Sequence, residues 1–95
     1  MIYSNVLLTV REESDIASVG ELLAEQGRLS RGEAGCLRFE VYQSQTESRF
    51  FMLIERWKDQ QALAEHRRAR AYCEIYQPRV LPLVDRVPHP SQLIG

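Results

Sequence analysis

The stretch from residue 50 to residue 66 constrains the fold more than any other part of the chain. It reads Phe-Phe-Met-Leu-Ile-Glu-Arg-Trp, followed by Lys-Asp-Gln-Gln-Ala-Leu-Ala-Glu-His. The first half begins with consecutive apolar residues and has no Gly or Pro, which predicts a strand. Both alternating faces of this strand carry large apolar groups, so we expect both faces to be covered. Asp59 then offers an N-cap for a helix that places His66 beside apolar residues.

The other predicted elements give the order βα-ββ-αβ. Two helices are expected, one beginning at Ser14 or Asp15 and ending near Leu29, the other continuing past His66 to a kink or break at Gln77, before Pro78. The four predicted strands cover residues 3–11, 36–43, 50–57 and 83–87, the last at an edge. This order is typical of a ferredoxin-like α+β fold, in which a four-stranded antiparallel sheet carries its helices on one face.

The length and the net charge limit the kinds of protein that this chain can be. The chain has 95 residues, and its 12 basic and 13 acidic residues give a net charge of −1. This length predicts a single domain over residues 1–95, with a core at about 3–87 and a tail at 88–95. The balanced charge gives no electrostatic reason to expect a nucleic acid or a membrane surface as partner.

The cysteines and the N-terminus bear on the compartment. The first residues have no basic region followed by an apolar run, so no signal peptide is predicted. Cys36 and Cys73 form no Cys-x-x-Cys pair and lie among residues that look buried, which indicates inert reduced thiols in a cytoplasmic protein. His66 and His89 show no metal-ligand spacing with the cysteines. We therefore expect no metal site.

Apolar residues on the sheet face that no helix covers indicate that the chain has a protein partner. That face would carry Leu7 together with either Phe51 and Leu53 or Phe50, Met52 and Ile54. Left uncovered, it would be a larger apolar patch than soluble monomers usually expose. A second copy of the chain is the simplest cover, so a two-fold homodimer is predicted.

Three segments together resemble a known family. They are Glu-Ala-Gly-Cys-Leu-Arg-Phe-Glu-Val-Tyr at residues 33–42, the strand end Glu55-Arg56-Trp57, and His66 on the following helix. Over about residues 3–85 the chain is similar to the antibiotic biosynthesis monooxygenases of the dimeric α+β barrel superfamily. The family usually has proline where this chain has Ala34, and a second helix histidine where it has Ala71. The resemblance implies a monooxygenase without metal, haem or flavin that oxidises a small aromatic or quinol-like substrate to a quinone.

His66 and Tyr72 are the candidate catalytic residues. An imidazole can take a phenolic proton at neutral pH, so the resemblance implies His66 as general base. The alternative for His66 is a structural histidine that donates to a backbone carbonyl. Tyr72 is expected to donate a hydrogen bond to a substrate carbonyl. Substrate contacts are expected in an apolar cavity between helices and sheet, from Asn5, Phe39, Met52 and Trp57.

Neighbouring residues have alternative structural roles. Trp57 can stack on an aromatic substrate or serve in core packing or the dimer contact, and Asn5 can serve the dimer instead of the substrate. Arg38 is expected to neutralise Glu55 as a cross-strand pair.

Two other functions stay open. One is a non-catalytic dimeric module that binds a small apolar ligand. The other is an isomerase of a phosphorylated dicarbonyl, as in a quorum-signal-processing branch that the return strand Ser48-Arg49-Phe50 resembles. Such an isomerase requires a phosphate site, for which the only evident cations are Arg67, Arg68 and Arg70; a solvated helix face is their simpler interpretation. The haem-degrading branch has tryptophan in place of His66, so haem degradation is not expected.

Overall fold

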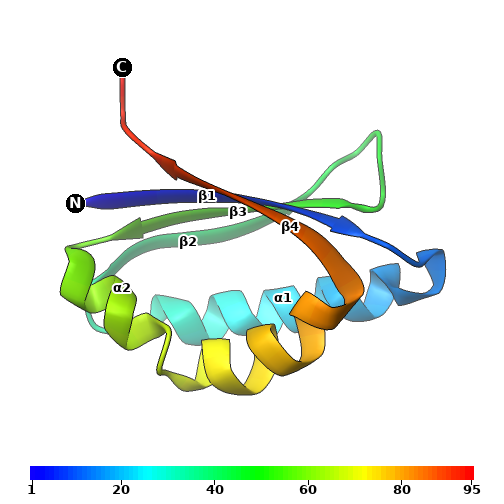
Figure 1. Cartoon of the computed structure of the whole chain (residues 1–95), viewed down its shortest axis with the longest axis horizontal. Helices are drawn as coiled ribbons and strands as arrows, with labels where there is room; N and C mark the ends of the chain where they lie inside the picture. The colour runs from blue at the N-terminus through cyan, green and yellow to red at the C-terminus, as the bar shows by residue number, and fades with distance from the viewer.

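The computed structural model describes all residues, 1–95, as one sheet covered on one side by helices (Figure 1). The elements in chain order are β1 (Ile2–Val10), α1 (Ile16–Arg31), β2 (Cys36–Gln43), β3 (Phe50–Trp57), α2 (Gln60–His66), η2 (Ala71–Val80) and β4 (Val84–Ser91). Short 3₁₀ turns at Glu13–Asp15 and Leu81–Leu83 lead into α1 and β4. The predicted order βα-ββ-αβ and the α+β class are confirmed.

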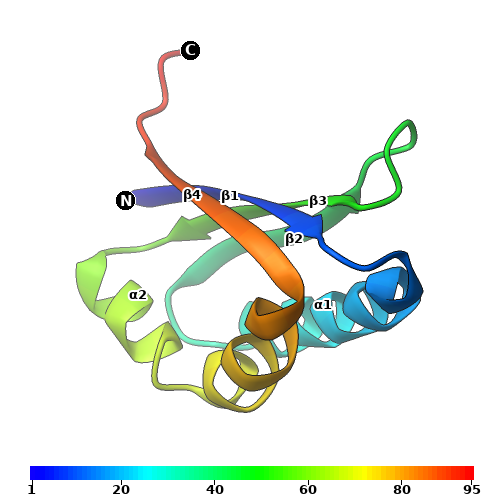
Figure 2. The same cartoon turned by 45° about the vertical axis from the view of Figure 1, so that its right-hand side comes forward.

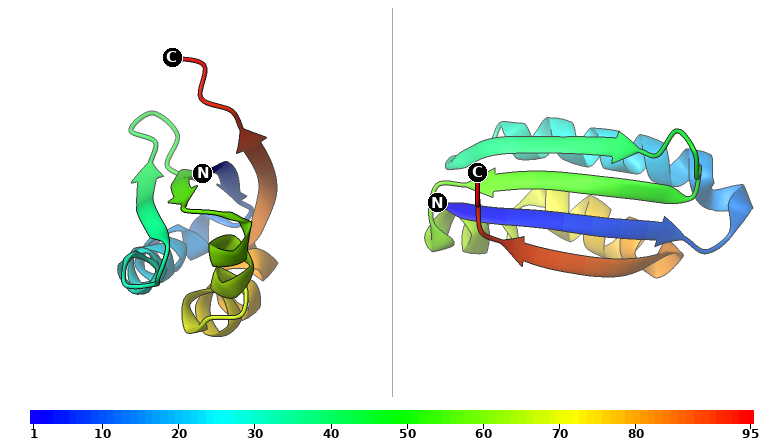
Figure 3. Two further views of the ribbon diagram at one scale, coloured as in Figure 1. Left: turned by 90° about the vertical axis from the view of Figure 1, so that its left-hand side faces the viewer. Right: turned by 90° about the horizontal axis from the view of Figure 1, so that it is seen from above.

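The four strands form one antiparallel sheet in the order β2-β3-β1-β4 (Figure 3). The strand of the opening motif, β3, is therefore central and pairs on both sides. The last strand lies at an edge, as its flanking prolines predicted. All the helices lie beneath one sheet face, and the C-terminus extends away from the opposite face (Figure 2).

The last strand is longer than predicted. The sequence indicated a strand at 83–87 and an irregular tail from 88, but β4 continues to Ser91. Pro88 and Pro90 lie opposite Val6 and Ser4 in the β1–β4 register. On an edge strand every second N–H points away from the neighbour, so prolines at alternate positions leave the ladder intact. The prolines therefore mark the free edge and do not end the strand.

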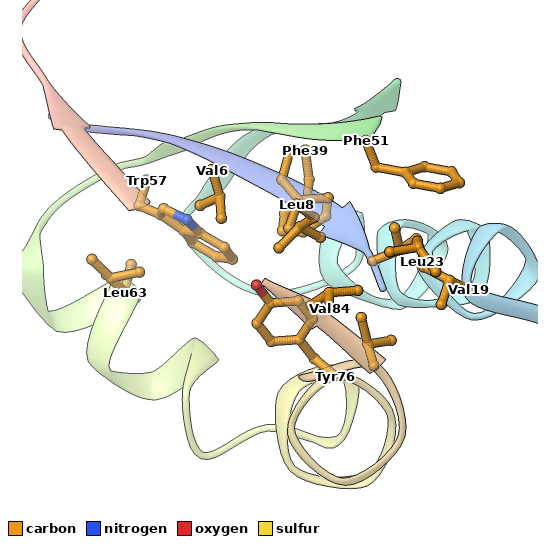
Figure 4. Packing of buried hydrophobic residues seen from close by; sticks show 14 residues of the cluster. Val6, Leu8, Val19, Leu23, Phe39, Phe51, Trp57, Leu63, Tyr76 and Val84 are labelled. Atoms are coloured by element: carbon orange, nitrogen blue, oxygen red, sulfur yellow. The ribbon is translucent and has the colours of Figure 1, made fainter. Parts of the chain in front are cut away.

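The two sheet faces differ in burial. Val6, Leu8 and Val10 of β1 are buried against the helices with Phe51, Leu53 and Trp57 of β3 (Figure 4). The opposite face, which we call the open face, carries Leu7 beside the half-buried Met52 and Ile54. The alternative that placed Phe51 and Leu53 on the open face is thus excluded, because β3 turns its Phe51–Trp57 side toward the helices.

Polar residues continue the buried face of α1. Val19 and Leu23 are fully buried, as predicted, and the face continues through Gln26, Gly27 and Ser30. The predicted stripe ended at Leu29, which is only half-buried. The inner face of the helix therefore becomes polar in its last two turns.

The second helical region divides into two helices. Asp59 caps α2 as predicted, with its Oδ1 accepting from the Ala62 N–H at 2.9 Å. The predicted kink or break at Gln77 is wrong, because η2 is a π-helix that runs past Pro78 to Val80. Pro78 lies on the exposed side of η2, where water can bond to the carbonyl group that the missing N–H leaves unpaired. The outer side of η2 also exposes Cys73, which was expected to be buried.

Candidate functional site

A glycine turn joins α1 to β2 and lets α2 pack closely against it. Gly35 has a φ of 81°, in the left-handed region that favours glycine. A Cβ on Gly35 would lie only 2.5 Å from the Cβ of Ala62 in α2. The Gly35 carbonyl also accepts from the Lys58 N–H at 2.8 Å. This close packing brings the turn, which carries Glu33, against the helix that carries His66.

His66 and Glu33 form a hydrogen-bonded pair. His66 Nδ1 lies 2.7 Å from Glu33 Oε1, and the two side chains are 4% and 18% exposed. An ionised carboxylate can only accept, so Nδ1 carries the proton that is donated to Glu33. In a neutral imidazole this leaves the lone pair on Nε2 available to a ligand.

Aromatic rings surround the imidazole. The His66 ring lies on the Trp57 indole, with centroids 4.4 Å apart and planes tilted by 35°. Phe39 contacts the histidine at 5.9 Å between centroids, and Tyr72 approaches edge-on at 5.8 Å. Trp57 is itself fully buried against the core (Figure 4). The ring cluster fixes the imidazole plane and excludes water from its faces.

A second carboxyl group lies buried beside the ring cluster. The Trp57 Nε1–H donates to Glu55 Oε1 at 3.0 Å. Burial raises the pKa of Glu55 above its ordinary value, although the bond from Trp57 and the nearby His66 oppose the shift. The predicted cross-strand pair of Glu55 with Arg38 is wrong. Arg38 lies on the open face, where its Nε donates to Glu40 at 2.7 Å.

Polar contacts continue from η2 to β4. The Tyr76 hydroxyl accepts from Arg86 Nε at 3.0 Å, and the Tyr76 ring lies 5.4 Å from that of Tyr72. Burial raises the pKa of Tyr76 to about 12, so its hydroxyl stays protonated at neutral pH. Tyr76 can therefore donate a hydrogen bond while Arg86 occupies its oxygen.

The predicted site residues fall into two groups. His66, Tyr72, Phe39 and Trp57 come together on the helix side of the sheet. Asn5 and Met52 lie on the open face, where Asn5 Nδ2 donates to Ser91 Oγ at 3.0 Å. The sheet thus separates these two residues from His66. Alternation along β1 and β3 determines this division.

The hollow that reaches His66 is a cleft of about 190 Å³. Besides His66, it is lined by Glu33, Ala34, Glu65 and Ala69. The apolar cavity expected beneath the sheet is filled by core side chains such as Phe39 and Trp57, which are fully buried. Larger hollows lie away from the histidine, and one of about 590 Å³ runs between α1 and β2. No cluster of three or more His, Cys, Asp or Glu side chains is arranged to hold a metal ion.

Three polar residues of this region were not predicted as site residues. Glu33 stood within the family motif but had no assigned role. Gln26 and Ser30 continue the spacing of Val19 and Leu23 at intervals of four, three and four residues. This spacing places Gln26 and Ser30 on the apolar stripe of the helix. It could have marked them in the sequence, because burial of a polar side chain without a hydrogen-bond partner is unfavourable.

Residues 1–77 match the family model described as antibiotic biosynthesis monooxygenase. No protein of curated function matches the sequence significantly. No helix of this chain combines the length and apolar character needed to cross a membrane.

Solved structures share the fold over nearly the whole chain. A Bacteroides thetaiotaomicron protein described as a possible oxidoreductase has 24% identity and a TM-score of 0.88, covering 97% of this chain and 96% of its own. A candidate antibiotic biosynthesis monooxygenase from Nitrosomonas europaea has 19% identity and a TM-score of 0.86, covering 98% and 99%. Another from Deinococcus radiodurans has 18% identity and a TM-score of 0.80, covering 98% and 94%.

Proposed function

Because the chain belongs to the antibiotic biosynthesis monooxygenase family, we propose that it oxidises a small aromatic or quinol-like substrate to a quinone with dioxygen and without a cofactor. The observation that carries this proposal is the buried His66–Glu33 pair at 2.7 Å, which opens on a cleft. His66 is the general base. It takes a hydroxyl proton from the substrate, and the resulting electron-rich anion gives electrons to dioxygen. For a hydroquinone, two electrons and both hydroxyl protons pass to dioxygen, so the products are quinone and hydrogen peroxide. For a phenol, one oxygen atom of dioxygen enters the ring and the other leaves as water.

The geometry around His66 supports a role as base. Glu33 accepts from Nδ1 and stabilises the tautomer whose free lone pair is on Nε2. The same carboxylate stabilises the imidazolium that forms when the proton arrives. Packing against Trp57 keeps the ring in one plane, so little reorganisation is needed during proton transfer.

The aromatic residues give the site its preference for rings. Phe39 and Trp57 form a rigid apolar wall beside His66. Tyr72 is only half-buried, and it is the ring that can move aside to admit a planar substrate and donate a hydrogen bond to its carbonyl oxygen. Exclusion of water from such a site protects an oxygen-reactive anion.

Oxygen uptake with a panel of hydroquinones tests the proposal. Wild-type protein is expected to consume oxygen and form quinone, and His66→Ala should reduce the rate by roughly 10²–10⁴-fold, as for loss of a general base. The matched control is His89→Ala, which removes the other histidine from the exposed end of β4. Equal rates in wild type and His66→Ala, or no uptake with any hydroquinone, would exclude His66-dependent oxidation.

The two other functions have less support. A non-catalytic binding module predicts ligands that raise the melting temperature but are never turned over. An isomerase of a phosphorylated dicarbonyl needs cations beside His66, yet Arg67 lines a different hollow and Arg70 approaches Glu74 at 3.8 Å. The cleft lining instead contributes the carboxylates of Glu33 and Glu65.

We also propose that the protein works as a homodimer in the reducing cytoplasm. Leu7 lies opposite Met52 on one side and Val87 on the other, which gives the open face a continuous apolar strip. A second copy that packs sheet against sheet would cover this strip. Members of the family are typically dimeric. The two cysteines are free, which accords with a reducing compartment.

A further inference from the structure

Two carboxylates line the cleft at His66, and neither has a lysine or an arginine as partner. The lining of the cleft contains no basic residue apart from the histidine. The Glu33 side chain bonds only to the His66 ring, and Glu65 Oε1 accepts only from the neutral amide of Gln61, at 3.3 Å. The other ion pairs of the chain use other carboxylates. The cleft therefore offers two negative charges to a ligand.

The His66 ring points to a ligand independently of these charges. Its side chain is 4% exposed and lines the cleft. Nδ1 is bonded to Glu33, whereas Nε2 has no hydrogen-bond partner within the chain. A buried polar atom of this kind is unfavourable unless a ligand or a water bonds to it. Nε2 accepts in the tautomer that Glu33 stabilises, so a hydroxyl group is the complementary ligand group.

The size of the cleft limits the ligand to a single ring with a short side chain. Its volume is about 190 Å³, whereas pockets for drug-sized ligands have roughly 300–1,000 Å³. Ala34 and Ala69 complete the lining. Their methyl groups leave room beside the imidazole and give a flat ring apolar contacts.

We propose that the cleft binds a phenol or hydroquinone whose ring carries a short aminoalkyl side chain, with the ammonium group between Glu33 and Glu65 and a ring hydroxyl at His66 Nε2. This inference rests on the proposed function, in which His66 takes the hydroxyl proton. An alkylammonium group is charged at neutral pH, as the lysine side chain is, and has three N–H donors. Glu33 can accept one of them through Oε2 while its Oε1 holds His66. Glu65 is then a specificity-determining residue.

Anaerobic calorimetry on the full chain tests the proposal separately from catalysis. Tyramine carries an aminoethyl group on a phenol ring, and tyrosol carries a neutral hydroxyethyl group at the same position. Wild type should bind tyramine roughly three- to tenfold more tightly than tyrosol, the effect of ion pairs at a partly exposed site. This ratio of affinities should fall toward one at about 1 M salt, where the Debye length is about 3 Å.

Glu65→Gln keeps the size of the side chain and removes its charge. It should lower the ratio by roughly two- to fivefold and leave the affinity for tyrosol unchanged. The matched control is Glu12→Gln, which removes the same charge from the exposed turn before α1, at the other end of the molecule from α2 (Figure 1). This control should keep the wild-type ratio.

Several outcomes overturn the proposal. They are equal affinity of wild type for tyramine and tyrosol, binding of neither ligand, and a ratio that neither salt nor Glu65→Gln lowers. Glu65 is exposed, so its replacement by glutamine should leave the fold intact. Oxygen uptake that depends on His66, without a preference for tyramine, would reject this inference and leave the proposed function standing. A preference for tyramine without oxygen uptake from any hydroquinone would reject the oxidation and leave this binding site standing.

Discussion

At the scale of single residues, Glu55 is the least expected feature of the core. Its side chain lies between the buried faces of β3 and the helices, and its one hydrogen bond comes from the neutral Trp57 indole. A negative charge on the Glu55 carboxylate would be attracted by His66, Arg86 and Arg67, but none of the three forms an ion pair with Glu55. Burial dominates and raises the pKa of Glu55, so the folded protein holds this proton more tightly than the unfolded chain does.

The raised pKa of Glu55 predicts a pH-dependent gain in stability for Glu55→Gln. Below the ordinary carboxyl pKa, Glu55 carries its proton in both the folded and the unfolded chain. Its ionisation therefore does not lower the free energy of unfolding there. As pH rises through the interval up to the folded pKa, the unfolded chain loses its proton first, so folding becomes less favourable. Glutamine keeps an oxygen for the Trp57 N–H and cannot ionise. The stability of Glu55→Gln relative to wild type should therefore be higher at pH 7 than at pH 4.

Urea unfolding at the two pH values measures this difference. Glu12→Gln, in the exposed turn before α1, is the control for a general change of net charge. If Glu55→Gln changes the free energy of unfolding by the same amount at pH 4 and pH 7, folding does not raise the pKa of Glu55.

At the scale of elements, the packing of α2 against the turn at residues 32–35 determines whether His66 meets Glu33. Gly35→Ala should weaken this packing in two ways. The left-handed φ costs roughly 1–2 kcal/mol for any residue with a Cβ. The new methyl group would also meet Ala62 at 2.5 Å and push α2 outward. We therefore expect a lower melting temperature and a loss of activity toward hydroquinones.

Gly32→Ala is the matched control in the same turn. Gly32 has a φ of −85°. The nearest atom to its Cβ position is the Leu29 carbonyl oxygen, at 3.5 Å. Alanine should therefore be tolerated with little change. Equal melting temperatures for the two variants would show that the Gly35 contact does not hold α2 in place.

The elements themselves follow closely from sequence patterns. The alternation of apolar residues predicted β1 and β3 correctly, and the Asp59 cap predicted the start of α2. Both signals are local in the sequence. The predicted end of β4 and the predicted break at Gln77 in η2 were wrong, since both depend on tertiary context. A proline often ends a helix or strand, but on a free sheet edge its missing N–H is not needed for strand pairing. In η2 the π-helix continues through Pro78.

The site could be predicted only in part. His66, Tyr72, Phe39 and Trp57 were expected to meet, and the structure brings them together. The alternation of β1 separated Asn5 from Leu8 and Val10, but it could not indicate which face the helices cover. The Glu33–His66 bond was not predictable, because it joins residues 33 positions apart through a turn whose geometry depends on packing.

At the scale of the whole molecule, the two sheet faces have separate tasks. The helix face holds the core and His66, and Trp57 on this face is 0% exposed in the single chain. The open face holds the apolar strip formed by Leu7, Met52 and Val87. The dimer contact that the sequence left open as a role for Trp57 does not fit this division, because Trp57 lies on the helix face and not on the open face. Folding and association should therefore be separable by experiment.

Met52→Lys is predicted to separate them. A charge in the middle of the open face would be buried between the two sheets of the proposed dimer, where an unpaired charge is strongly unfavourable. In a monomer the same lysine reaches water, so the core should survive. Sedimentation should then give a species of 11.0 kDa, with Trp57 emission still blue-shifted and moving to the red only when urea unfolds the chain. Gln45→Lys adds the same charge on the exposed β2–β3 hairpin and should stay dimeric. A Met52→Lys protein that remains dimeric would exclude the open face as the interface, and red-shifted emission from a folded monomer would show that the Trp57 site needs the second copy.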